Sequence, residues 1–229
     1  YPLRRQRQMC IRDRGLTIAC FALFVSSFLC AYIHSAPKLA IEQYFGRGSK
    51  YVDFNALFMP TFAVDLLAGF TMRMWITKMA VCHDQGDTKT LNKLIIKQMG
   101  VIAFITVVSM LVMYFAGGWA LSLLYGRDLY GYEWSNALLM LAGGMVAVYT
   151  LFENVIIIYR HQHFSIVINI VSAVATVIIM PLFTRSGGVL GATLAYLAAN
   201  TIRAIGYIAC ALYYMNKDKK NNQKIPARN

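Results

Sequence analysis

The chain has 229 residues, of which 58% are hydrophobic and only 14% are charged, and its mean hydropathy is +0.51. A soluble domain carries about 25% charged and about 45–50% apolar residues, so this composition excludes an ordinary water-soluble fold with a polar surface. The net charge of +12 would suggest nucleic acid in a soluble protein, but here the basic residues flank apolar segments, where they indicate topology and anionic lipid. We therefore expect membrane lipids, and no nucleic acid, as partners.

Six apolar segments follow one another along the chain. They lie at about 15–34, 54–80, 98–120, 134–159, 164–184 and 188–214. Each contains the roughly 20 residues that a helix needs to cross a hydrocarbon core of about 30 Å, and a lone strand would leave its backbone groups unpaired in lipid. The sequence therefore predicts an all-α, polytopic transmembrane helix bundle with six spans over residues 15–214.

The two ends of the chain differ in composition from this bundle. Residues 1–14 (YPLRRQRQMCIRDR) carry five arginines and give way abruptly to the first apolar segment. We expect them to be a non-native segment that takes no part in the fold. Residues 215–229 are polar and basic, which is typical of a cytoplasmic tail beside anionic lipid.

The connection at residues 81–97 has a pattern of its own. A turn is followed by Leu91 and Ile95 at helical spacing, with Lys93 and Lys97 on the opposite side. This pattern predicts a separate amphipathic helix that lies on the inner membrane surface.

The basic residues between the spans predict the orientation of the bundle. If the start of the first span lies inside, the inner connections and tail contain ten basic residues: Lys78, Lys89, Lys93, Lys97, Arg160, Lys217, Lys219, Lys220, Lys224 and Arg228. The outer connections then contain five, namely Lys38, Arg47, Lys50, Arg127 and Arg185. Cytoplasmic loops carry the excess of Lys and Arg, so both ends of the bundle are expected in the cytoplasm.

Five charged residues within or beside the spans are candidate site residues: Asp65, Arg73, Glu153, Arg160 and Arg203. A charge near the centre of a spanning helix costs about 2.5–3.5 kcal/mol on insertion scales, so it is expected to face a partner or a water-filled cavity. One interpretation is therefore a cationic cavity for an anionic substrate. In the other, the arginines snorkel to the headgroups while the acids form structural pairs.

The sequence offers no pattern for catalysis or metal binding. His161 and His163 flank Gln162 without a third ligand nearby, and no hydrolase, metalloprotease or nucleotide-binding motif is present. We therefore expect neither a metal nor another cofactor, and no enzymatic activity.

Several stretches together resemble a known family of membrane proteins. They are SAPKLAIEQYFG, FNALFMPTFAVDLLAGFTMRMWITKMA, LSLLYGRDLYGYE, LLMLAGGMVAVYTLFENVIIIYRHQ and GGVLGATLAYLAAN. In their order and spacing they are similar to Wzx-type flippases of the multidrug/oligosaccharidyl-lipid/polysaccharide exporter superfamily. The resemblance covers about residues 15–214 and implies the C-terminal lobe of a two-lobe fold, with the N-terminal lobe of the same protein as its missing partner.

The resemblance also implies a function. Such proteins move lipid-diphosphate-linked glycans across the bacterial plasma membrane by alternating access, and the arginines, above all Arg73 and Arg203, would contact the anionic head. Two alternatives within transport are a multidrug or cation exporter, which would use Asp65 and Glu153, and a peptidoglycan-precursor flippase. The alternative of another class is a membrane-embedded transferase.

Overall fold

We describe the chain from a computed structural model, which defines residues 2–159, 161 and 163–224. These residues form helices connected by short turns, with no strand in the described part of the chain. In chain order the helices are α1 (Pro2–Phe45), α2 (Ser49–Asp84), α3 (Thr88–Phe115), α4 (Gly117–Tyr125), α5 (Glu133–Ile158) and α6 (His163–Lys224). The all-α prediction is confirmed.

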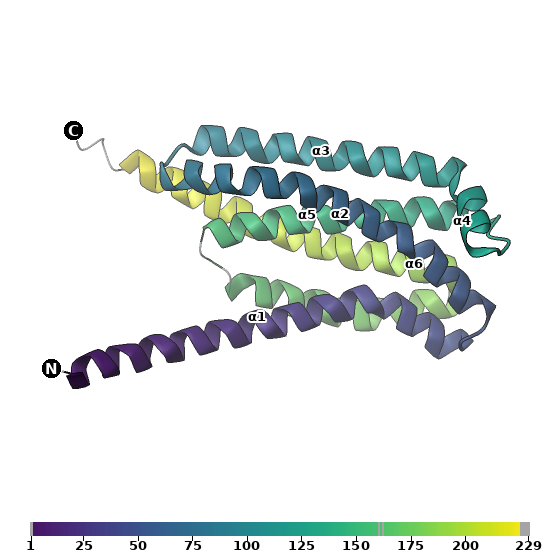
Figure 1. Cartoon of the computed structure of the whole chain (residues 1–229), viewed down its shortest axis with the longest axis horizontal. Coiled ribbons are helices and arrows are strands. Elements are labelled where there is room, and N and C mark those ends of the chain that lie inside the picture. The colour runs from purple at the N-terminus through teal and green to yellow at the C-terminus, as the bar shows by residue number, and fades with distance from the viewer. Residues whose placement is uncertain (1, 160, 162, 225–229) are drawn as a thin grey trace.

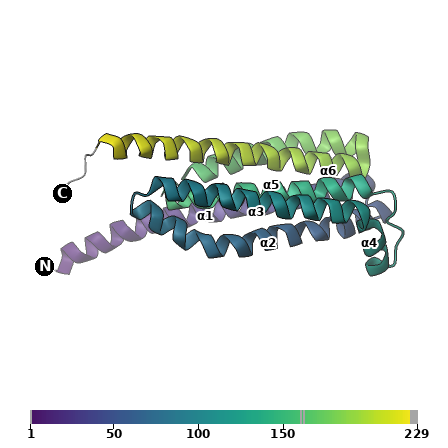
Figure 2. The same ribbon diagram turned by 90° about the horizontal axis from the view of Figure 1, so that it is seen from above.

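The helices lie along one long axis, and Figure 1 shows that α1 begins and α6 ends at the same end of the bundle. We call this end the terminal end. The α1–α2 turn, α4 and the middle of α6 lie at the opposite end, which we call the hairpin end (Figure 1). Figure 2 shows the last part of α6 running along one side of the bundle, back to the terminal end.

The helix α6 is a hairpin rather than one straight rod. At Gly188 the backbone adopts φ 56° and ψ −129°, a conformation that is essentially limited to glycine. The hydroxyl of Tyr207 nevertheless lies 3.3 Å from Oδ1 of Asn169, although the two residues are 38 positions apart. A straight helix of that length would separate them by about 57 Å at 1.5 Å per residue. The first arm, residues 163–187, and the second arm, residues 189–224, therefore run side by side in opposite directions.

This hairpin explains how the predicted spans relate to the observed helices. Five helices in the described part of the chain are long and apolar enough to cross a membrane: α1 over Phe24–Phe45, α2, α3, α5 and α6 over His163–Asp218. The sequence predicted six spans, and its fifth and sixth segments both fall in α6. Several crossing helices are the hallmark of a multi-pass membrane protein.

The prediction of a separate surface helix over residues 81–97 is wrong. Only a short turn follows α2, and Asp87 then caps α3, its side chain accepting a hydrogen bond from the Thr90 amide at 3.0 Å. The predicted amphipathic stretch forms the first turns of α3 itself. Its apolar face is buried, as expected from the spacing, since Leu91 and Ile95 pack inside the bundle.

The interior is divided into two hydrophobic clusters. The hairpin-end cluster combines side chains of α1, α2, α4, α5 and both arms of α6, including Ile41, Phe58 and Tyr196. The terminal-end cluster combines α2, α3, α5 and the second arm of α6, and none of the α1 side chains that the structure describes belongs to it.

Two adjacent glycines bring α5 close to the helices on either side. A Cβ atom at Gly143 would lie 3.2 Å from the backbone oxygen of Thr61 in α2, and one at Gly144 would overlap the Thr106 side chain in α3. Only glycine permits this close approach. Many large apolar side chains on the outer surface remain exposed, which suits contact with lipid. They include Phe24, Phe28, Leu66, Phe70, Phe104, Leu111, Phe115, Val174 and Ile178.

Candidate functional site

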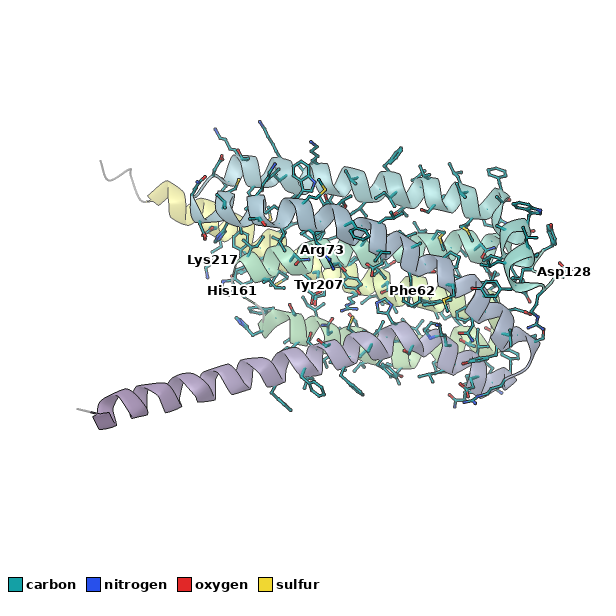
Figure 3. The ribbon with its side chains drawn as sticks, in the orientation of Figure 1. Phe62, Arg73, Asp128, His161, Tyr207 and Lys217 are labelled. Atoms are coloured by element: carbon teal, nitrogen blue, oxygen red, sulfur yellow. The ribbon has the colours of Figure 1, made fainter. Side chains whose placement is uncertain are left out.

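A cluster of polar side chains lies between α1 and the helices α5 and α6. We call it the polar cluster, and its members are Ser26, Cys30, His34, Tyr149, Glu153, Asn169, Tyr196, Arg203 and Tyr207. Members on α1 and on α5 are four residues apart, and those on the second arm of α6 are seven and four apart, so each set shares one face of its helix. Figure 3 shows Tyr207 among the side chains that fill the middle of the bundle.

The Arg203 side chain is the most buried charge of the cluster. It is only 1% exposed, and its Nη1 donates to the Cys30 sulfur at 3.3 Å. The guanidinium carbon lies 3.8 Å from the ring centre of Tyr149 and 5.9 Å from that of Tyr207. Such contacts between a cation and an aromatic face contribute about 0.5–2 kcal/mol. They hold the guanidinium in place without neutralising its charge.

No carboxylate of the described residues lies within 4.0 Å of Arg203. Its Nε is buried without a hydrogen-bond partner among them. Burying a charge is costly unless it is paired, and a cation without an acid in a low-dielectric interior strongly favours the approach of an anion.

His34 connects Tyr149 on α5, which contacts Arg203, with Tyr196 on the second arm of α6. Its Nδ1 lies 2.9 Å from the Tyr196 hydroxyl, and its Nε2 lies 3.2 Å from the Tyr149 hydroxyl. A neutral imidazole has one donor and one acceptor nitrogen, so one tyrosine donates to His34 and the other accepts. The ring is therefore fixed between α5 and the second arm of α6.

The rest of the polar cluster joins α1 to both arms of α6. The Tyr207 hydroxyl lies 3.1 Å from Glu153 Oε1, and the Asn169 amide donates to Ser26 Oγ at 2.6 Å. Glu153 thus accepts a hydrogen bond from a phenol and forms no ion pair with Arg203. These hydrogen bonds act together with apolar contacts in holding α1, since Ile33 on the same helix is fully buried.

Asp65 lies beside the polar cluster, half-buried on α2. It lines two narrow cavities of about 10 Å³ each, and one of these is shared with His34 and Tyr196. A volume of this size is about that of one water molecule. Asp65 is therefore a neighbour of the His34 imidazole across a space for a single water.

The remaining predicted site residues lie elsewhere. Arg73 is exposed on α2 and forms no hydrogen bond or ion pair with another described residue, and Figure 3 shows its position. Arg160 lies outside the described residues. The structure thus brings Arg203, Glu153 and Asp65 together in the middle of the bundle and leaves Arg73 on its surface.

Most members of the polar cluster were not singled out from the sequence. On α1, Ser26, Cys30 and His34 recur every four residues inside an apolar helix, and this periodicity was the available signal. Hydroxyl and thiol groups carry no charge, so they do not stand out in an apolar segment as Arg203 does.

Comparison of the chain with models of protein families, with curated proteins and with solved structures gives no match. Among the described residues, no three His, Cys, Asp or Glu side chains are placed to bind a metal ion. The chemistry of the site is therefore inferred from the polar cluster itself. A buried guanidinium that lies against tyrosine rings and has no carboxylate partner among the described residues suits the recognition of an anion.

Proposed function

We propose that the chain is the C-terminal lobe of a transporter that moves a lipid-linked oligosaccharide across the bacterial plasma membrane. In this proposal the two arms of α6 are two separate crossings, so that the lobe has six. The ends then lie on the cytoplasmic side. That orientation agrees with the basic residues of the first turns of α3, Lys89, Lys93 and Lys97, because α3 begins at the terminal end.

The observation that carries the proposal is the burial of Arg203 without an acid beside it. An isolated charge at this depth is expensive to maintain, and intramembrane charges mark substrate pathways more often than they stabilise a fold. An anionic head, such as the diphosphate of a lipid-linked glycan, would balance the charge. Because Arg203 is 1% exposed, the contacts around it must open before a substrate can reach it, as alternating access requires.

The attachment of α1 supports the same proposal. In its middle part α1 is held to α6 by hydrogen bonds such as Ser26–Asn169 and Cys30–Arg203. A polar seam can take up water when it opens, whereas an apolar one cannot do so cheaply. The polar head of a lipid-linked substrate would cross along this seam while its lipid tail stays in the bilayer. Arg73, exposed on α2, is assigned to the face that meets the second lobe.

The test uses the complete gene in a bacterial strain that depends on it for surface glycan. Arg203→Gln removes the charge, and we expect glycan export to fall about thirtyfold or more, the equivalent of about 2 kcal/mol for an unpaired charge contact. Arg203→Lys keeps the charge but not the planar fork, so it should retain part of the activity. Arg47→Gln is the matched control, because Arg47 is exposed and paired with Glu42.

Equal expression and equal thermal stability of the variants are required for the comparison. Export by Arg203→Gln at the rate of the original protein would overturn the proposal. The exported glycan is also analysed by mass spectrometry, since a covalent change in the molecule would indicate a transferase instead of a transporter.

Asp65 favours one second candidate, a cation exporter. It is a half-buried acid that shares a water-sized cavity with His34, and it forms no ion pair among the described residues. An exporter of organic cations should lose transport on Asp65→Asn and tolerate Arg203→Gln. The glycan transporter should instead lose transport on Arg203→Gln.

A further inference from the structure

A second site lies at the hairpin end, far along the bundle axis from the terminal end. It is an open pocket of about 530 Å³, within the range of about 300–1,000 Å³ that is typical of small-molecule sites. Three chain reversals meet here: the turn after α1, the start of α5 and the reversal of α6 at Gly188. We call it the hairpin-end pocket.

The basic residues at this end fall into two groups. Arg47 is paired with Glu42, and Arg127 with Asp53 at 3.3 Å, and none of these four residues lines the pocket. Lys50 and Arg185 do line it, and neither is within 4.0 Å of a carboxylate in the described part of the chain. Lys38 also has no carboxylate partner among the described residues, but it lies 4.7 Å from the centre of the Phe58 ring and does not line the pocket. The pocket thus contains two cations whose charge is not compensated by an acid.

The acidic residues near the pocket do not line it, and their carboxylates accept hydrogen bonds from backbone amides. Glu133 follows Tyr132 in the chain, but its carboxylate accepts a hydrogen bond from the Gly131 amide at 3.0 Å and does not line the pocket. Asp128 accepts from the Tyr130 amide at 3.1 Å. The lining therefore contains positive charge and hydroxyl groups, but no carboxylate, which favours an anionic ligand.

Aromatic rings provide the rest of the lining. Phe45, Tyr132 and Trp134 contribute to the pocket, and Trp134 is 67% exposed. The centre of the Phe45 ring lies 4.4 Å from Lys50 Nζ, so this ring positions a cation, and the exposed Trp134 ring packs edge to face against Tyr114 with the ring centres 5.4 Å apart. An exposed indole can cover the apolar C–H face of a sugar ring, while the sugar hydroxyls reach Ser186 and the backbone of the glycine turn.

We infer that the hairpin-end pocket binds an anionic sugar, such as a sugar phosphate or a uronic acid. Lys50 and Arg185 hold the negative group, and Trp134 and Tyr132 lie against the sugar ring. The inference rests on the proposed function for the source of the sugar, which is the glycan at the end of its passage. The binding itself can be measured without transport.

The experiment uses the chain in nanodiscs of phosphatidylcholine alone, so that no anionic lipid competes. Trp75→Phe and Trp119→Phe leave Trp134 as the one tryptophan of the three in the sequence. Glucose 1-phosphate is titrated and Trp134 fluorescence is recorded, with glucose and inorganic phosphate as separate probes. We expect a saturable change with glucose 1-phosphate at about tenfold lower concentration than with either other probe, since each lacks one kind of contact.

Charge variants test the assignment of the two cations. Lys50→Gln with Arg185→Gln should weaken glucose 1-phosphate binding about tenfold or more, because both charge-assisted contacts are lost. Arg47→Gln removes one charge at the same end, outside the pocket, and should leave the affinity within about twofold. Trp134→Leu, followed by equilibrium dialysis with labelled glucose 1-phosphate, tests the aromatic contact independently and should also weaken binding.

The outcomes separate this inference from the proposed function. The inference would be overturned if glucose 1-phosphate gave no saturable signal. It would also be overturned if inorganic phosphate bound equally tightly, which would indicate a site for phosphate or a lipid headgroup. Loss of binding in the double variant while export by the complete protein is unchanged would support binding at the pocket, overturn the exported glycan as the source of the sugar, and leave the proposed function standing. If binding is as expected but the complete protein exports no glycan, the inferred sugar binding at the hairpin-end pocket is supported and the proposed function is contradicted.

Discussion

Asp87 supplies the cap from which α3 starts. Its carboxylate accepts a hydrogen bond from Thr90, and this bond holds the pKa of Asp87 below its ordinary value of 3.8. A lowered pKa in the folded state means that the cap stabilises the fold at pH values above 3.8. That contribution disappears as the pH falls through the lowered pKa, because both states are then protonated.

The first prediction concerns this cap. Asp87→Ala should lower the melting temperature at neutral pH, and the difference from the original chain should shrink as the pH falls below about 3.8. Asp87→Asn is the control, because asparagine caps a helix without titrating. Thermal unfolding in detergent across acidic pH values measures all three. A difference that stays constant down to the lowest pH at which the chain is folded would contradict the assignment.

At the same scale, Arg203 shows what can be predicted from single residues. A guanidinium in an apolar helix is conspicuous, so its inclusion among the candidates required no structure. Its neighbours Cys30 and Tyr149 were not predicted, because neutral side chains carry little penalty in an apolar segment. Their contacts with Arg203 also depend on how α1, α5 and α6 pack, which no local pattern in the sequence specifies.

At the scale of elements, hydropathy located the spans but not all their boundaries. The third segment was expected from residue 98, whereas α3 begins at Thr88. Lys89, Lys93 and Lys97 lower the mean hydropathy of the first turns, although Leu91 and Ile95 bury one face of them. When apolar content alone is considered, the basic first turns of α3 and its apolar remainder are therefore assigned to two separate helices, although they form one continuous helix.

The α6 hairpin gives the second prediction. Gly188→Ala should destabilise the chain by about 1–3 kcal/mol, because its φ of 56° with ψ −129° is strained for any residue with a Cβ. Gly187→Ala is the matched control: a Cβ there meets nothing within 4 Å and its φ is not positive. That variant should change stability by less than about 0.5 kcal/mol. The melting temperatures of the two variants are measured in detergent. If both variants lost the same stability, the chain reversal would not depend on Gly188.

At the scale of the whole molecule, the hairpin determines on which side of a membrane each end lies. If α6 crossed once, the five candidate helices would place the two ends on opposite sides. If its arms cross separately, the six crossings place both ends on one side. This agrees with Figure 1, in which α1 begins and α6 ends at the same end of the bundle.

The third prediction follows from this parity. Reporter tags at the start of α1 and after α6 should be protected together or accessible together in sealed membrane vesicles. Single cysteines at Arg47 and Arg127, which lie at the hairpin end, should react with an impermeant thiol reagent from the other side, in a background without the native cysteines. Ends found on opposite sides would contradict two crossings by α6.

The pairing of α1 with α6 has a consequence for biosynthesis. Ser26 and Asn169, which join the two helices, are 143 positions apart. At about 5–20 residues per second, a ribosome needs roughly 7–30 s to make the intervening chain. During that time the polar face of α1, with Cys30 and His34, is in the membrane before its partner exists. The helix α1 is therefore made well before the part of α6 with which it packs, and its polar face stays without those partners until the final hairpin is inserted.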